Sequence, residues 1–204
     1  MAALKNETVF LGDRTAEVTR NTKETQITAT VALDGSGESE ISTGVNFLDH
    51  MLYQIVHHCG IYMNIKAKGD LQVDEHHTIE DVAIVLGDAI SKALGSKMGI
   101  GRYGFTLPMD DCKALVLIDL GGRIDFDWNV EFTREYIGDL PTEMLKHFFK
   151  SLSCALNCNL HISASGENNH HKAEAIFKGF ARALKMAIKQ EAFNYQLPSS
   201  KGIL

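Results

Sequence analysis

The sequence predicts an α+β fold made of two similar halves, residues 1–98 and residues 99–204. Segments rich in Val, Ile and Thr, which are typical of strands, alternate with longer segments whose apolar residues recur at helical spacing. The order strand, helix, strand, helix occurs once in each half. The pattern His-His-x-x-Glu also occurs twice, at His76 and at His170, an offset of 170 − 76 = 94 residues. We therefore expect one compact, internally duplicated domain with its helices packed on one side of mixed sheets.

The first half contains two predicted strands and two predicted helices. Residues 24–33 alternate in polarity and are rich in Thr, so they predict a strand that ends at the Gly-containing turn 34–37. Apolar residues within 47–56 trace one face of a helix, and residues 61–67 alternate as a second strand. A second helix is expected from His76 to about residue 94, before a glycine.

The second half repeats this plan. Residues 114–120 and 124–132 predict strands, and Pro141 is expected to open the helix that follows them. Residues 160–164 predict a further strand, and the last helix should run from His170 to about residue 191. The segment that joins the halves, residues 99–104, reads Gly-x-Gly-x-x-Gly. It follows a predicted helix and opens none, so it does not predict a dinucleotide site.

Histidine and glutamate residues form the most informative pattern. Each His-His-x-x-Glu pattern opens a helix, and each is preceded by a helix with one histidine in matching phase, His50 or His147. A repeated ligand set of this kind predicts bound metal. The eight candidate ligands are His50, His76, His77, Glu80, His147, His170, His171 and Glu174.

Helix geometry suggests how these ligands are grouped. Residues i and i+4 share a face, whereas adjacent residues diverge by about 100°. The simplest arrangement is therefore two sites that each mix the halves and contain three imidazoles and one carboxylate, a set suited to Mn, Fe, Zn, Co or Ni. Because adjacent histidines face apart, some ligands are expected to come from a neighbouring subunit. One site would take His76, Glu80, His147 and His171, and the other would take His170, Glu174, His50 and His77.

Composition excludes other classes of protein. The net charge of −6 and the lack of a basic run argue against nucleic-acid binding. No apolar stretch approaches the roughly 20 residues that span a bilayer, and the first residues lack the features of a signal peptide. Four cysteines without Cys-x-x-Cys spacing are expected to be reduced thiols. A cytoplasmic protein is expected.

Six motifs are spread over nearly the whole chain: residues 20–25 (RNTKET), 47–52 (FLDHML), 76–81 (HHTIED), 108–111 (PMDD), 166–171 (GENNHH) and 198–202 (PSSKG). Together they resemble one known family, imidazoleglycerol-phosphate dehydratase of histidine biosynthesis. The resemblance implies a carbon–oxygen lyase with two Mn²⁺ per subunit. It also implies halves that resemble ribosomal protein S5 domain 2, and a homo-24-mer with metal sites at subunit contacts.

The same resemblance implies a reaction and its residues. D-erythro-imidazole-glycerol phosphate would lose water through a metal-stabilised imidazolate and give imidazole-acetol phosphate. Glu24 is the expected general acid/base, with a metal-bound water as its alternative. Glu24, Gln54, His58 and Lys178 should contact the substrate. The expected phosphate-binding residues are Arg102, Arg123, Ser199 and Lys201.

This chain departs from the family pattern at a few positions. The family usually has Ser where this chain has Gly121, and often Glu at Asp111. The phosphatase domain of some members is not expected here.

Other classes of metal-binding protein fit the sequence less well. A di-iron carboxylate oxidase or iron store would use Glu-x-x-His spacing and almost pure helix. A non-catalytic metal-binding module would leave the cations unexplained, and a zinc peptidase lacks its motif.

Overall fold

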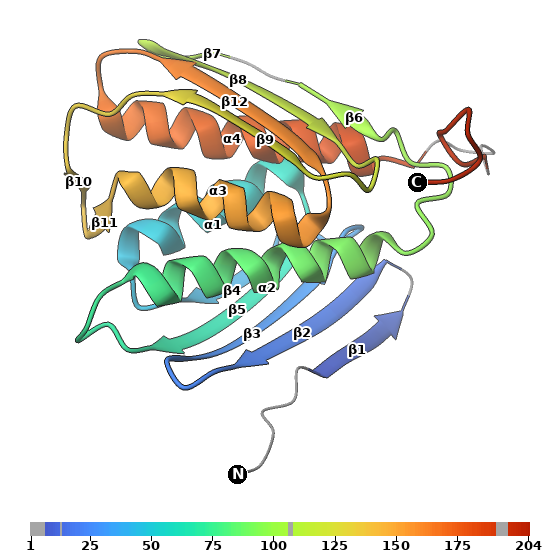
Figure 1. Cartoon of the computed structure of the whole chain (residues 1–204), viewed down its shortest axis with the longest axis horizontal. Helices are drawn as coiled ribbons and strands as arrows, with labels where there is room; N and C mark the ends of the chain where they lie inside the picture. The colour runs from blue at the N-terminus through green and yellow to red at the C-terminus, as the bar shows by residue number, and fades with distance from the viewer. Residues whose placement is uncertain (1–6, 13, 106–107, 191–195) are drawn as a thin grey trace.

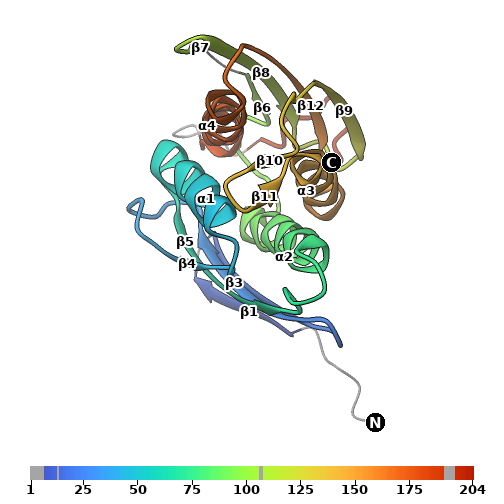
Figure 2. The same cartoon turned by 90° about the vertical axis from the view of Figure 1, so that its left-hand side faces the viewer.

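Two β-sheets enclose a layer of four helices in the computed structural model of this chain (Figure 1). The structure describes residues 7–12, 14–105, 108–190 and 196–204. Seen from one end, the helices lie between the sheets, so each sheet carries helices on one face (Figure 2). The helices are α1 (Asn46–Cys59), α2 (His76–Leu94), α3 (Glu143–Leu156) and α4 (Asn169–Ile188).

The two sheets have the same strand arrangement around their centres. In the first sheet the order is β1-β2-β3-β5-β4, and in the second it is β6-β8-β12-β9, with β7 also paired to β8. Both contain antiparallel and parallel pairs, so both are mixed. The strands of the first sheet are β1 (Glu7–Gly12), β2 (Thr15–Asn21), β3 (Thr25–Ala32), β4 (Ser39–Ser42) and β5 (Tyr62–Gly69). Those of the second are β6 (Tyr103–Gly104), β7 (Pro108–Met109), β8 (Cys112–Asp119), β9 (Asp125–Val130) and β12 (Asn159–Ser165).

Alternating side chains explain why the sheets bury only one face. Every second residue of β3 and of β8 is buried, beginning with the first residue of each strand, Thr25 and Cys112. The helices supply the other side of the core, including Phe148, Phe149 and Phe177. At Gly87 a Cβ atom would lie 2.8 Å from the Leu152 carbonyl oxygen, so glycine lets α2 approach α3 closely.

The predicted α+β class and the four helices are confirmed, but some boundaries differ. The prediction missed β1, β2, β4 and the two-residue strands, among them β10 (Tyr136–Ile137) and β11 (Leu140–Pro141). Pro141 belongs to β11, and α3 begins two residues later because Thr142 hydrogen-bonds back to Arg134 and Glu135. The predicted end of the last helix, residue 191, lies outside the described residues. None of the described helices is both long and apolar enough to span a membrane.

Candidate metal centres and phosphate pocket

One cluster of metal-ligand side chains forms where α2 and α3 begin. His76 and Glu80 lie one turn apart on α2, with His76 Nε2 3.6 Å from Glu80 Oε2. His147 of α3 faces them, its Nε2 3.3 Å from Glu80 Oε1 and its ring 4.6 Å from the His76 ring. One ligand atom from each residue falls within 4.8 Å of the others. Helix packing thus brings together residues that are 147 − 76 = 71 positions apart.

A second cluster with the same composition forms between α1 and α4. His170 and Glu174 lie one turn apart on α4, with Nε2 3.7 Å from Oε2, and the ring of His50 on α1 lies 6.1 Å from that of His170. Burial raises the pKa of Glu174, but the hydrogen bond and charge of Lys178 outweigh it and lower that pKa below its ordinary value. The carboxylate is therefore held in the ionised form that a cation requires.

Both clusters have the chemistry of a divalent metal site. Two imidazoles and one carboxylate suit first-row transition metals. The buried Nε2 atom of His147 makes no hydrogen bond within the described residues, although it lies close to Glu80. A buried ring nitrogen without a hydrogen-bond partner is costly unless a ligand completes it. The residues therefore fit a metal ion.

The fourth predicted ligand of each site lies elsewhere. The rings of His76 and His77 are 6.2 Å apart and nearly perpendicular, and those of His170 and His171 are related in the same way. Within the described chain neither His77 nor His171 joins a three-residue cluster. Each instead meets a carboxylate through Nδ1, and these hydrogen bonds raise the pKa of both imidazoles.

The predicted substrate residues gather in two places near the clusters. Gln54 and His58 follow His50 along α1 at intervals of one turn, and Lys178 donates to Glu174 at 2.9 Å. Burial and then the charge of Lys178 lower the pKa of His58. Glu24 lies instead in the turn before β3, with Oε2 3.9 Å from His77 Nε2 and half of its side chain exposed.

All four predicted phosphate-binding residues line one cavity of about 430 Å³ at the C-terminal end of α4. Arg102 is held in place, because its guanidinium bonds both oxygens of Asp119 at 2.6 and 3.0 Å and the Pro198 carbonyl at 2.8 Å. Arg123 and Lys201 are exposed. Ser200, which the prediction did not include, lines the same cavity.

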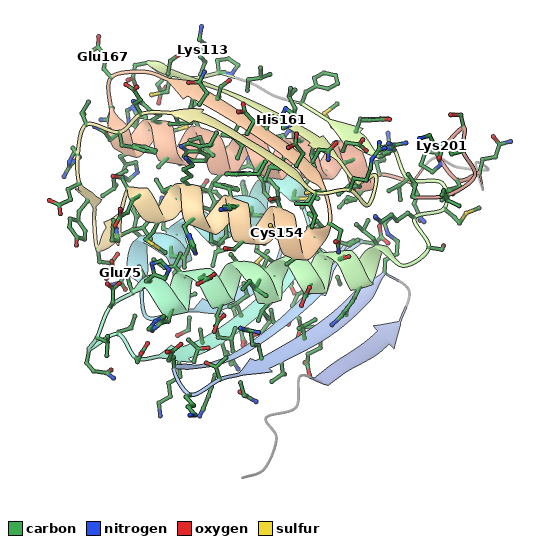
Figure 3. All side chains as sticks on the ribbon, viewed as in Figure 1. Glu75, Lys113, Cys154, His161, Glu167 and Lys201 are labelled. Atoms are coloured by element: carbon green, nitrogen blue, oxygen red, sulfur yellow. The ribbon has the colours of Figure 1, made fainter. Side chains whose placement is uncertain are left out.

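The cavity and the metal-ligand clusters lie at opposite ends of the molecule. Glu75, which precedes His76, and Glu167, near His170, mark one end, and Lys201 marks the other (Figure 3). The helix α4 runs between them, and its 20 residues span about 30 Å. A small molecule bound at either cluster therefore cannot also reach this cavity of the same chain.

Comparisons with known proteins agree on one family. A family model described as imidazoleglycerol-phosphate dehydratase matches residues 43–184. The chain is 59% identical over 198 residues to the histidine biosynthesis bifunctional protein HisB of Bacteroides fragilis, and 52% identical over 201 residues to HisB of Campylobacter jejuni. These alignments cover 97% and 98% of this chain but 53% and 56% of those proteins. The chain thus spans about half the length of the curated relatives it matches.

Solved structures extend the similarity to the fold. The crystal structure of imidazoleglycerol-phosphate dehydratase from Staphylococcus aureus has a TM-score of 0.78 and 34% identity, covering 86% of this chain and 99% of that one. The Pyrococcus furiosus structure, a complex with (S)-C348, has a TM-score of 0.76 and 35% identity, covering 91% and 99%. On the family match, the sequence identity and the shared fold, this chain belongs to the imidazoleglycerol-phosphate dehydratase family.

Proposed function

We propose that this chain is the subunit of a metal-dependent imidazoleglycerol-phosphate dehydratase. It would convert D-erythro-imidazole-glycerol phosphate to imidazole-acetol phosphate and water in L-histidine biosynthesis. The observation that carries this proposal is the pair of His-His-Glu clusters in a chain that belongs to this family. The two mixed sheets also argue against a four-helix di-iron oxidase or iron store.

The metal ions would be held by the two clusters, one by His76, Glu80 and His147 and the other by His50, His170 and Glu174. We propose Mn²⁺, two per subunit, as the resemblance to the family implies; the mixed nitrogen and oxygen donor set also suits Fe, Zn, Co or Ni. When bound, the ions supply Lewis acidity that draws electron density from the substrate's imidazole ring.

The chain's own residues then position the substrate and move its protons. Glu24, half exposed beside His77, would take the proton from the carbon next to the one that carries the leaving hydroxyl. That proton and the hydroxyl together make the water that is lost, and the resulting enol takes a proton on carbon to become the ketone. Gln54, His58 and Lys178 would orient the substrate beside Glu174.

The phosphate group would be bound by a neighbouring subunit. Arg102, Arg123, Ser199 and Lys201 share one cavity at the far end of α4, a helix about 30 Å long, so one substrate would bridge two chains. Charge-assisted bonds from the two guanidinium groups would hold the phosphate. Subunit contact would also bring His77 and His171 to complete the clusters of neighbouring chains. We propose that these contacts build a homo-24-mer.

Two further proposals concern origin and location. The shared strand order and the repeated ligands support duplication of a half that resembles ribosomal protein S5 domain 2, with residues 1–98 and 99–204 as the copies.

The free thiols support a cytoplasmic location. Cys59, Cys112 and Cys158 are buried and form no disulfide, which suits a reducing compartment.

The direct test is formation of imidazole-acetol phosphate by the purified protein. The chelated protein should form none, and added Mn²⁺ should restore product formation. A variant that lacks both His50 and His147 is the matched control, since it should stay inactive with Mn²⁺. Absence of product with Mn²⁺, and equally with Fe, Co, Ni and Zn ions, would refute the proposal.

A further inference from the structure

The two histidines that stand outside the clusters are each held by a carboxylate at the same ring nitrogen. His171 Nδ1 lies 2.7 Å from Asp111 Oδ1. His77 Nδ1 lies 3.2 and 3.1 Å from the two oxygens of Asp70. An ionised carboxylate only accepts hydrogen bonds, so Nδ1 must carry the proton in both rings. The Nε2 atom is therefore the one that is left to bind a metal.

Asp111 is itself fixed by the loop that leads into α4. Its Oδ2 atom accepts from the backbone N–H groups of Glu167 at 3.0 Å and Asn168 at 2.9 Å. One oxygen thus anchors the carboxylate to the backbone while the other orients the imidazole.

The corresponding position in the first half is occupied by Glu24. Glu24 immediately precedes β3 and Asp111 immediately precedes β8, and these eight-residue strands pair antiparallel with β5 and β12 respectively. Yet Glu24 lies 3.9 Å from Nε2 of His77, on the ligand side of the ring, whereas Asp111 binds Nδ1 of His171. In the first half, Asp70 at the end of β5 binds Nδ1 instead.

We propose that Asp111 and Asp70 are positioning residues that fix His171 and His77 with the proton on Nδ1 and with Nε2 free for a metal ion. By taking this role in the first half, Asp70 releases Glu24 to act on the substrate. The inference deepens the proposed function and rests on its assignment of both histidines as metal ligands. Carboxylates that orient metal-binding histidines in this way usually change metal affinity 10–100-fold when they are removed.

Asp111→Asn provides the sharpest test because it preserves shape and reverses one hydrogen bond. The Asn oxygen would keep the two backbone N–H bonds, which forces its NH₂ group toward His171 Nδ1 and drives the ring proton to Nε2. Mn²⁺ affinity, measured by the electron paramagnetic resonance signal of free Mn²⁺, should fall about 10–100-fold. Asp111→Glu, which retains a carboxylate, should restore most of it. Asp110→Asn is the matched control, since its left-handed φ of 46° suits Asn and it should leave the affinity unchanged.

A second pair of variants, Asp70→Ala and Glu24→Gln, separates the roles of the two carboxylates near His77. Asp70→Ala should weaken Mn²⁺ binding. Its control is Asp74→Asn, which also removes one negative charge but keeps an acceptor for the His76 amide, and which should leave the Mn²⁺ affinity unchanged. Glu24→Gln should abolish turnover with Mn²⁺ affinity intact. In the Co²⁺-substituted protein, Asp70→Ala and Asp111→Asn should alter the visible absorption bands that report coordination, and Glu24→Gln should not.

The outcomes separate this inference from the proposed function. Wild-type affinity in Asp111→Asn and Asp70→Ala would overturn the inference, as would equal losses in the Asp110 and Asp74 controls. If Glu24→Gln weakened metal binding as much as Asp70→Ala does, the division of roles would be wrong. If Asp111→Asn failed to fold, Asp70→Ala would decide, because the hydrogen bonds that described residues make to its carboxylate go to His77 alone. A wild-type protein that bound Mn²⁺ but formed no product would refute the proposed function only.

Discussion

The Nε2 atom of His147 lies 3.3 Å from Oε1 of Glu80, yet it is buried and makes no hydrogen bond within the described residues. In the proposed function, this ring nitrogen binds a metal ion that it shares with His76. His147→Ala should therefore remove one of the two ions and leave the ion held by the second cluster, while His50→Ala should do the reverse. Elemental analysis of the dialysed proteins is the measurement. Loss of both ions from either single variant would contradict two independent clusters.

The sequence predicted the clusters well because helical periodicity alone places His76 with Glu80 and His170 with Glu174. It also predicted that each adjacent histidine would point elsewhere, which the nearly perpendicular rings of each pair agree with. Pairing His147 with the first cluster and His50 with the second followed from treating the halves alike. The structure brings these side chains together in that way, while their binding of metal stays a prediction.

The roles of Asp70, Asp111 and Asp119 could not be predicted from the sequence. Each carboxylate contacts a partner that is distant in the chain or on another element, such as the loop of residues 166–168 that reaches Asp111. The short strands β6, β7, β10 and β11 were missed because two residues carry no periodic pattern. The separation of the clusters from the cavity lined by Arg102 and Arg123 is likewise a property of packing, since it depends on the direction in which α4 runs.

Arg123 and Arg102 should respond differently to substitution. Arg123 is exposed beside the cavity, so Arg123→Ala should raise KM about tenfold or more and leave metal content and melting temperature unchanged. Arg102→Ala should raise KM and also lower the melting temperature, because Asp119 and the Pro198 carbonyl lose their donor. Kinetics and thermal melting of both variants would check this. An unchanged KM in Arg123→Ala would remove it from the phosphate site.

Subunits defective at opposite ends should rescue each other. A chain without His50 and His147 keeps its phosphate pocket, and an Arg123→Ala chain keeps its clusters. If each active site joins two chains, particles reassembled from the mixture should contain sites that pair an intact cluster with an intact cavity, so their kcat/KM should exceed that of either variant alone. The control mixes Arg123→Ala with Lys201→Ala, which share a defective end and should show no such gain. Failure of the first mixture, with mixed particles verified by mass spectrometry, would contradict a shared site.

Asp139 caps the start of α1 from the β10–β11 turn. Its carboxylate accepts from the Asn46 and Phe47 amides at 2.7 and 2.8 Å. Burial alone would raise its pKa, but these hydrogen bonds outweigh it and lower the pKa below the ordinary value. Asp139→Ala should lower the free energy of unfolding by about 0.5–2 kcal/mol near neutral pH.

The acid dependence of that loss follows from the direction of the shift. A lowered folded-state pKa stabilises the protein above the unfolded-state pKa, and the contribution disappears as pH falls through the folded-state pKa. The difference in free energy of unfolding between Asp139→Ala and the wild type should therefore shrink as the pH falls below the ordinary pKa range of Asp. Urea unfolding of chelated protein at several pH values would measure it without interference from metal loss. A difference that stayed constant to the lowest pH would mean that the charge of Asp139 does not carry the effect.

Metal removal should also disassemble the particle. Each cluster contains three ligands from one chain, and His77 and His171 lie outside the clusters with Nδ1 bound to carboxylates. If these histidines complete the clusters of neighbouring chains, the ions bind the assembled form more tightly than the separate subunits, so binding and assembly are thermodynamically linked. Chelation should then give smaller oligomers without activity, and Mn²⁺ should restore both size and activity. Low pH should act in the same direction, because a protonated imidazole cannot bind a metal.

Size exclusion with light scattering gives the mass of the particle in each state. The His77→Ala variant should remain a small oligomer even with Mn²⁺ present. A fully metal-free protein with the mass of the loaded one would show that the ions do not hold the subunits together.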